Sequence, residues 1–244
     1  MKLLFVFIAQ LVFAVQVCSA SQPQLAGEQH AVENQSVSSL DAVGGRVLIM
    51  YAPPASPQQL WAGTTHGGLW HSADAGQSWT LASEAMKGMA VGALAVDPLN
   101  ADMMYAGTGE GRSNNAALGG HGMFRSGDGG LSWSLLPLSD PATVGENWSH
   151  INSVAISASG VILAATSDNQ YNGFIYRSVD GGQTWGLVPV YTGSKVGPHN
   201  IVYKVRFDPD NPNTALFIDA YANVTHSRDG GLTWSIAKKS TVCP

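Results

Sequence analysis

An eight-residue motif, S-x-D-x-G-x-[ST]-W, occurs four times in this chain and constrains its fold more than any other feature. Consecutive copies of its aspartate are 54, 52 and 49 residues apart. Self-similarity at a nearly fixed period is the signature of a repeat architecture, in which each unit folds into the same small structure. The fixed positions are Ser72, Asp74, Gly76, Trp79, Ser126, Asp128, Gly130, Trp133, Ser178, Asp180, Gly182, Trp185, Ser227, Asp229, Gly231 and Trp234.

Each motif predicts a tight hairpin turn followed by a short strand. Glycine adopts positive φ angles freely, and an aspartate carboxylate accepts hydrogen bonds from the backbone of its own turn. The tryptophan is expected to begin the next strand and to pack its flat ring against neighbouring residues. These final strands are expected at Trp79–Ala82, Trp133–Leu136, Trp185–Val188 and Trp234–Ala237.

Three further apolar runs precede each motif, as in Tyr203–Phe207, Ala215–Asp219 and Val224–Ser227 of the last repeat. Four short antiparallel strands per repeat form the unit of a β-propeller blade. The sequence therefore predicts an all-β protein, a β-propeller of four blades over residues 43–239. The blades are expected at about 43–83, 90–137, 151–189 and 201–239.

Four blades raise the question of closure, because each must turn by about 90° around the axis to complete a ring. The chain is therefore a small closed ring, an open or partial propeller, or a fragment of a longer protein. An open propeller exposes the apolar faces of its end blades, and such faces favour self-association.

The composition excludes several classes of protein. The 244 residues include only 12 Lys and Arg against 17 Asp and Glu, so the net charge is −5. A basic patch for a nucleic-acid backbone is therefore not expected. Hydrophobic residues make up 45% of the chain, which indicates a packed core rather than disorder.

The first twenty residues have the pattern of a secretory signal peptide. Lys2 precedes the apolar run Leu3–Val17, and small residues at the end of the run favour cleavage after Ala20. The mature chain is then secreted or periplasmic and has no membrane span. A retained anchor, or lipidation at Cys18, is the alternative. Residues 21–42 are expected to form a linker or flexible arm, and residues 240–244 a tail in which the role of Cys243 is open.

These repeats resemble the BNR, or Asp-box, repeat superfamily over roughly residues 43–239. Its members include sialidases, xyloglucanase-type glycoside hydrolases, sortilin-type receptors and photosystem assembly factors. The stretch from Tyr105 to Gly130 is most similar to the xyloglucanase and sortilin branches of exported repeat proteins. The resemblance implies the propeller fold, with the motifs as structural turns on the outer rim. It implies no single activity, because enzymes, receptors and scaffolds share the motif.

Ligands of propellers usually contact the face formed by the loops between second and third strands and by the crossings between blades. We expect candidate ligand-binding residues on this face, where aromatic, amide and charged side chains suit a glycan. No metal site and no cofactor are expected. The candidates are Arg112, Asn114, His121, Trp148, His150, Tyr171 and His199.

Two functions from different classes remain open at this point. The first is a binding or interaction module for a glycan or an extracytoplasmic protein, because no recognisable catalytic set is present. The second is a glycoside hydrolase relative, xyloglucanase- or sialidase-like. Such an enzyme needs two carboxyl groups flanking one bond. Glu110 with Glu146 or Asp168 is the candidate pair.

Overall fold

The computed structural model describes residues 45–111, 117–139, 145–170, 172–189, 191–192, 195–196 and 199–236. The chain divides into two compact units, residues 1–33 and 34–244, and every described residue belongs to the second. The predicted signal peptide (1–20), arm (21–42) and tail (240–244) lie outside the described residues.

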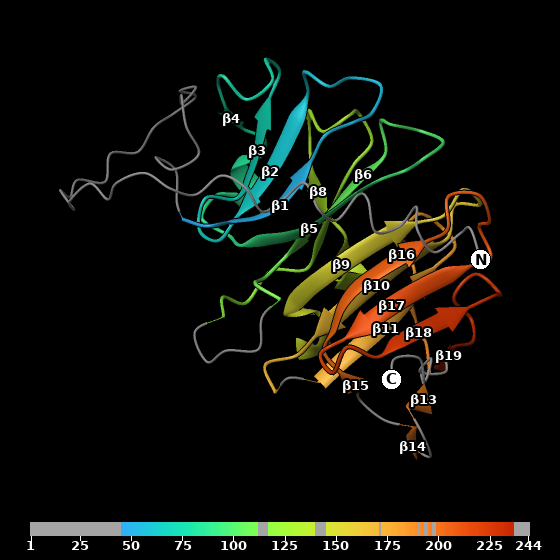
Figure 1. Cartoon of the computed structure of the whole chain (residues 1–244). Coiled ribbons are helices and arrows are strands. Elements are labelled where there is room, and N and C mark those ends of the chain that lie inside the picture. Colours follow the sequence, from blue (N-terminus) through green and yellow to red (C-terminus); the bar gives the residue numbers. More distant parts are fainter. Residues whose placement is uncertain are drawn as a thin grey trace, which may run out of the picture. The chain divides into compact units, whose positions relative to one another are not determined.

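Four antiparallel sheets of four strands each follow one another along the chain (Figure 1). In each sheet the strand order is the order of the sequence. The first sheet consists of β1 (Val47–Tyr51), β2 (Leu60–Thr64), β3 (Leu69–Ser72) and β4 (Thr80–Leu81), and the second of β5 (Val91–Val96), β6 (Met104–Thr108), β7 (Met123–Ser126) and β8 (Ser134–Leu135).

The third sheet consists of β9 (His150–Ile156), β10 (Ile162–Ser167), β11 (Asn172–Ser178) and β12 (Gly186–Leu187), and the fourth of β16 (Val202–Phe207), β17 (Ala215–Asp219), β18 (Val224–Ser227) and β19 (Ser235–Ile236). Between them lie a small hairpin, β13 (Tyr191–Thr192) and β14 (Lys195–Val196), and β15 (His199–Asn200), which pairs with β11. Short 3₁₀ turns η3 (Glu84–Met86), η4 (Pro137–Ser139) and η5 (Glu146–Trp148) complete the described elements.

The final strand of each sheet is only two residues long and begins one residue after the tryptophan. The expectation that tryptophan begins this strand is therefore wrong. Each tryptophan directly precedes this strand, and in three of the four motifs its indole N–H donates to the carbonyl oxygen of the motif glycine. Trp133 bonds Gly130 at 3.0 Å, and Trp79 and Trp234 bond their glycines at 3.2 Å. The one exception is Trp185, whose Nε1 is buried without a partner.

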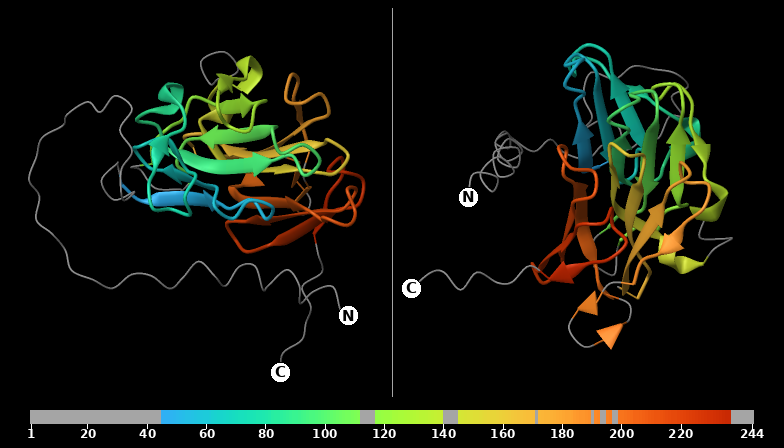
Figure 2. Two further views of the ribbon diagram at one scale, coloured as in Figure 1. Left: turned by 90° about the horizontal axis from the view of Figure 1, so that it is seen from above. Right: turned by 90° about the vertical axis from the view of Figure 1, so that its right-hand side faces the viewer.

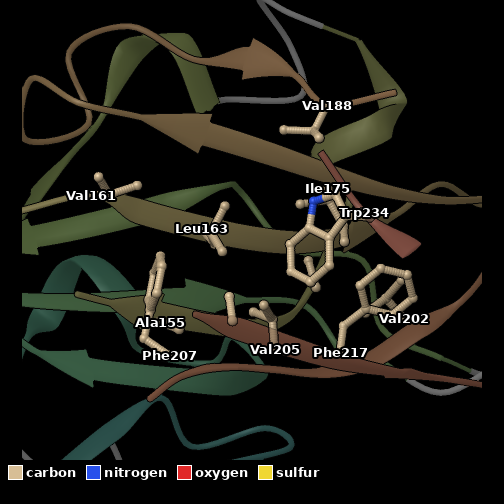
Figure 3. Close-up of a cluster of buried hydrophobic side chains, with 12 residues drawn as sticks. Ala155, Val161, Leu163, Ile175, Val188, Val202, Val205, Phe207, Phe217 and Trp234 are labelled. Carbon is tan, nitrogen blue, oxygen red and sulfur yellow. The ribbon is translucent and has the colours of Figure 1, made fainter. Parts of the chain in front are cut away.

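The first strands of successive sheets pack against one another: β1 contacts β5, β5 contacts β9, and β9 contacts β16. Figure 2 shows the third sheet (yellow) beside the fourth (orange to red). A large apolar cluster fills the space between these two sheets, with Leu163 and Ile175 on one side and Phe217 and Trp234 on the other (Figure 3). The four sheets thus form a partial propeller.

Small residues in the second strands allow neighbouring sheets to approach closely. A Cβ atom at Gly63 would collide with the backbone of Val91, and one at Gly107 would collide with the side chain of Ile151. The third sheet has Ala165 at this position, and it shares a buried cluster with Val202. In each joint, a branched residue of the next first strand therefore fills the space above a glycine or alanine.

The four repeated motifs, from here on the repeat turns, connect the third and fourth strands of each sheet. In the first, the Ser72 hydroxyl donates to Asp74 Oδ1 at 2.7 Å and accepts the N–H of Gly76 at 2.8 Å. Asp74 also accepts the N–H and the hydroxyl of Ser78. Hydrogen bonds from Ser78, and then from Ser72, lower the pKa of Asp74 to about 2.

The other three repeat turns have the same hydrogen bonds, from Ser126, Ser178 and Ser227. Hydrogen bonds from the following serine or threonine hold the pKa of Asp128 and Asp180 at about 2. At Asp229 burial raises the pKa, but the hydrogen bonds from Thr233 and Ser227 outweigh it, and the pKa is again about 2. The oxygens of these carboxylates are engaged in hydrogen bonds inside their own turns.

Each repeat turn after the first docks on the preceding sheet. A Cβ at Gly130 would collide with the indole ring of Trp61, and one at Gly231 would lie 2.8 Å from a methyl group of Leu163. Hydrogen bonds reinforce these contacts, since Arg177 Nε donates to the carbonyl oxygen of Gly230 at 2.9 Å. The repeat turns therefore contribute both apolar contacts and hydrogen bonds to the packing between neighbouring sheets.

Candidate functional site

A pocket with a volume of about 140 Å³ lies where the beginnings of the four first strands come together. All four sheets contribute to it, and Glu110 and Gly111 reach it from the loop between β6 and β7. Its walls are formed by Arg46, Val47, Leu48, Gly92, Glu110, Gly111, Asn152 and Tyr203.

An ion pair between Arg46 and Glu110 is the main polar feature of the pocket. Arg46 Nη2 donates to Glu110 Oε1. The guanidinium side chain is 53% exposed, whereas the carboxylate side chain is only 8% exposed. The pair therefore presents charged donors toward solvent while one oxygen of a buried carboxylate is already engaged.

Backbone hydrogen bonds hold the chain at Glu110 and at the residue before it. The N–H of Glu110 donates to the carbonyl oxygen of Leu118 at 2.8 Å, and the N–H of Gly109 donates to that of Ala90 at 2.9 Å. Gly109 has φ +94° and lies against the backbone of Ser149, so a larger residue would not be accommodated.

Asn152, in β9, lines the pocket and is 8% exposed. Its Nδ2 donates to the carbonyl oxygen of Val202 at 3.0 Å, which ties β9 to β16. Its Oδ1 is buried without a hydrogen-bond partner. Gly111 lies directly against this amide, because a Cβ at Gly111 would collide with Oδ1. An unpaired buried acceptor of this kind is uncommon and favours a donor from outside.

Tyr203, at the beginning of β16, completes the pocket on the side of the fourth sheet and is 42% exposed. An exposed aromatic ring beside an arginine, a carboxylate and an amide gives both a stacking surface and hydrogen-bonding groups. These are the groups that bind the apolar face and the hydroxyls of a sugar.

Of the three predicted carboxylates, Glu110 is the one that the structure places in the pocket. Asp168 instead closes its own loop. It accepts the N–H groups of Gln170 and Asn172 through Oδ1 and the amide of Asn172 through Oδ2, all at 2.8 Å. Both oxygens of Asp168 are occupied by structural hydrogen bonds, which leaves it poorly suited to act on a substrate.

The predicted ligand-binding residues Trp148, His150 and His121 do not line the pocket. Trp148 is 2% exposed and packs its ring between Tyr176 and Trp185, with centroid distances of 4.6 and 5.1 Å. It is a core residue and cannot contact a ligand in this arrangement. His150 is the first residue of β9, not part of a crossing, and is buried. Its Nε2 is 3.1 Å from Asn169 Oδ1. His121 is exposed and lies outside the pocket.

The remaining predicted site residues cannot be placed in full. Arg112, Asn114 and Tyr171 lie outside the described residues. Glu146 begins η5 and His199 begins β15, but their side chains are not described.

Sequence reasoning missed Arg46, Asn152 and Tyr203, which belong to the beginnings of first strands rather than to loops. Asn152 and Tyr203 share one position, directly after Ile151 and Val202, and this shared position is the signal that could have revealed them. Arg46 directly precedes Val47 of β1 and has no such signal. Sequence reasoning also missed Asp219, which closes its loop as Asp168 does. Asp219 Oδ1 accepts the N–H groups of Tyr221 and Asn223, both at 2.9 Å. The shared D-x-x-x-N spacing identifies both as loop caps.

In the part of the chain that the structure describes, no cluster of three or more metal-ligating side chains is present. The described residues also include no helix with the length and apolar character of a membrane span.

Neither a family model nor a curated protein sequence matches the chain. Solved structures are similar to it. An ancestral GH74 enzyme superposes with a TM-score of 0.57 and 25% identity, over 79% of this chain and 24% of that enzyme. The GH74 xyloglucanase from Xanthomonas campestris has a TM-score of 0.55 and 18% identity, over 82% and 31%. An auxiliary nutrient binding protein from Bacteroides thetaiotaomicron has a TM-score of 0.54 and 12% identity, over 86% and 51%.

The chain therefore spans between a quarter and a half of the length of these proteins. At such identities the likeness is mainly one of fold. Together with the four sequential sheets, it shows that this all-β protein has the architecture of a partial β-propeller.

Proposed function

We propose that this chain is an exported binding module of the BNR, or Asp-box, type that holds a glycan at the pocket formed by its first strands. The observation that carries the proposal is the convergence of Arg46, Glu110, Asn152 and Tyr203, from four different sheets, on one small cavity. Groups brought together from distant parts of a chain on a rigid frame are the usual basis of a binding site.

The chemistry of the pocket suits one edge of a sugar ring. Arg46 supplies N–H donors, and the free oxygen of Glu110 accepts from a hydroxyl. Tyr203 offers a ring face for the C–H side of a sugar. A cavity of about 140 Å³ is smaller than a site that encloses a whole ligand, so we infer that the glycan lies across the face with one residue inserted.

The second candidate, a glycoside hydrolase, draws its support from the GH74 enzyme at 25% identity. Hydrolysis requires a second carboxyl group within about 10 Å of the first. Among the described residues that line the pocket, Glu110 is the sole acid, and Asp168 is occupied in its own loop. This distribution favours binding over turnover.

The proposal is tested by calorimetric titration of the chain with xyloglucan oligosaccharides, chosen because a xyloglucanase is among the similar structures. We expect measurable binding that Tyr203→Ala and Glu110→Gln weaken by about tenfold each. Tyr221→Ala, at an exposed tyrosine outside the pocket, is the matched control and leaves the affinity unchanged.

Absence of binding, or equal binding by all variants, would contradict the proposed site. Release of new reducing ends during the titration, lost in Glu110→Gln, would support the hydrolase instead. Export is tested separately: mass spectrometry of the mature protein is expected to find Ser21 at its N-terminus.

A further inference from the structure

The outer face of the fourth sheet is the side turned away from the third sheet, and it is exposed. Cross-strand pairing places two rows of residues on it, Lys204–Ile218–Val224 and Arg206–Leu216–His226. The three aliphatic side chains are 37–45% exposed. In the first three sheets, the corresponding face is covered by the next sheet along the chain.

Ile218 occupies the position that is small in the other sheets. It pairs with both neighbouring strands as Gly63, Gly107 and Ala165 do. Those small residues provide the space for a branched residue of the next first strand. Ile218 fills that space with its own side chain. The fourth sheet thus lacks the feature by which each earlier sheet receives its neighbour.

This difference argues against a second copy of the chain as the occupant. By strand pairing, Val47 of β1 corresponds to Val91 and Val202, the residues that fill such spaces. A second copy that continued the series would bring Val47 against Ile218. Two branched side chains cannot occupy, without strain, the volume that one fills beside glycine.

The charge of the face points to a different occupant. In the second and third sheets, the positions of Lys204 and Arg206 are taken by alanine or serine. No described carboxylate forms an ion pair with Lys204 or Arg206, and Arg206 donates only to the neighbouring carbonyl oxygen of Val205. Burial and the nearby Arg206 lower the pKa of Lys204 to about 8. Two adjacent cations without an anion are stabilised by an acidic partner.

We propose that the outer face of the fourth sheet binds an acidic polypeptide segment in an extended conformation. Side chains of an extended segment alternate with a period of two, so carboxylates can reach Lys204 and Arg206 while apolar residues pack on Leu216 and Ile218. The exposed aliphatic residues favour a polypeptide over an anionic glycan. The two rows share no residue with the lining of the glycan pocket, and the inference does not depend on the proposed function.

The test is fluorescence anisotropy with two labelled peptides, one alternating Glu with Val and Leu, the other with every Glu replaced by Gln. The acidic peptide is expected to bind about tenfold more tightly than the Gln peptide. The double variant Lys204→Gln, Arg206→Gln removes this difference, and Ile218→Ser weakens both peptides. Lys87→Gln, at an exposed lysine elsewhere, serves as the control and binds as the unaltered chain does.

Three results would overturn the inference. Equal affinity for the two peptides would remove the role of charge. Tight binding of polygalacturonate, with no binding of either peptide, would assign the surface to an anionic glycan. A dimer detected by light scattering, and lost in Ile218→Asp, would assign it to a second copy of the chain.

Discussion

The phenol of Tyr105, in the second sheet, donates its hydrogen to the carbonyl oxygen of Gly181 in the third repeat turn, at 3.0 Å. Arg177 makes the equivalent contact one sheet later, with Gly230. Each bond joins residues of consecutive repeats more than fifty positions apart. These hydrogen bonds add to the apolar packing between sheets. Unlike that packing, they require a specific orientation of one sheet relative to the next.

The variant Tyr105→Phe tests the hydrogen bond between the second sheet and the third repeat turn. The ring stays buried, so the variant removes one hydrogen bond and little packing. We expect a loss of about 0.5–1.5 kcal/mol in the free energy of unfolding, measured by urea denaturation. Tyr221→Phe, at a tyrosine that is 71% exposed, is the control and should not change stability. An unchanged Tyr105→Phe variant would mean that water replaces the bond at no cost.

Gly107→Ala tests the close approach of neighbouring sheets. The added methyl group would meet the side chain of Ile151, and we expect a destabilisation of about 1–3 kcal/mol. Gly119→Ala has open space around its Cβ and should be neutral. The double variant Gly107→Ala, Ile151→Ala, which lacks the Cγ2 atom nearest to the new methyl group, should lose less stability than the sum of the two single variants. Equal unfolding midpoints for Gly107→Ala and Gly119→Ala would contradict the packing described.

The first repeat turn contains Ala75 with φ +57°, where the other three have glycine with φ near +70°. Ala75→Gly should therefore stabilise the chain, by up to about 1 kcal/mol, because a left-handed backbone is unfavourable for alanine. Gly181→Ala should cost a similar amount. The measurement is the thermal unfolding midpoint of both variants, and a shift in the same direction for both would refute the prediction.

Acid sensitivity should follow from the repeat turns. The pKa of Asp180 in the folded chain is about 2, below its ordinary value of 3.8. The stability that this carboxylate contributes is fully present above about pH 4 and is lost as the pH falls toward 2. Asp180→Asn should lower the unfolding midpoint at pH 7 and flatten its decline between pH 4 and 2. Parallel curves for both proteins would contradict this role.

The Arg46–Glu110 pair should respond unequally to loss of its two partners. Arg46→Met leaves a carboxylate that is 8% exposed without its cation, and we expect a loss of about 1–3 kcal/mol. Glu110→Gln leaves a guanidinium that solvent can still hydrate, so the loss should stay below about 1 kcal/mol. Denaturant titrations of both variants at neutral pH measure the difference, and the reverse order would show that the carboxylate is not desolvated.

Much of the fold follows from the sequence because the repeat turn requires particular residues. Serine, aspartate and glycine occur at the same positions in all four turns. Their positions in the sequence therefore show where the third strand of each sheet ends and the fourth begins. The lengths of β4, β8, β12 and β19 could not be predicted, because each of these edge strands ends where its pairing with the third strand ends, and the motif does not determine that point.

The pocket was predictable only in part. Glu110 lies in a long irregular loop, a place where ligand-binding residues gather, and was found for that reason. Arg46, Asn152 and Tyr203 lie in or next to ordinary strands and become neighbours through the arrangement of four sheets. No local pattern in the sequence reports a contact between residues 46, 110 and 203.

The joints between sheets have a consequence for how the chain is made. Every joint described here links one repeat to the repeat that follows it, so the partner of each new sheet has already left the ribosome when that sheet is synthesised. Assembly can therefore proceed in the order of translation, each finished module acting as the template for the next.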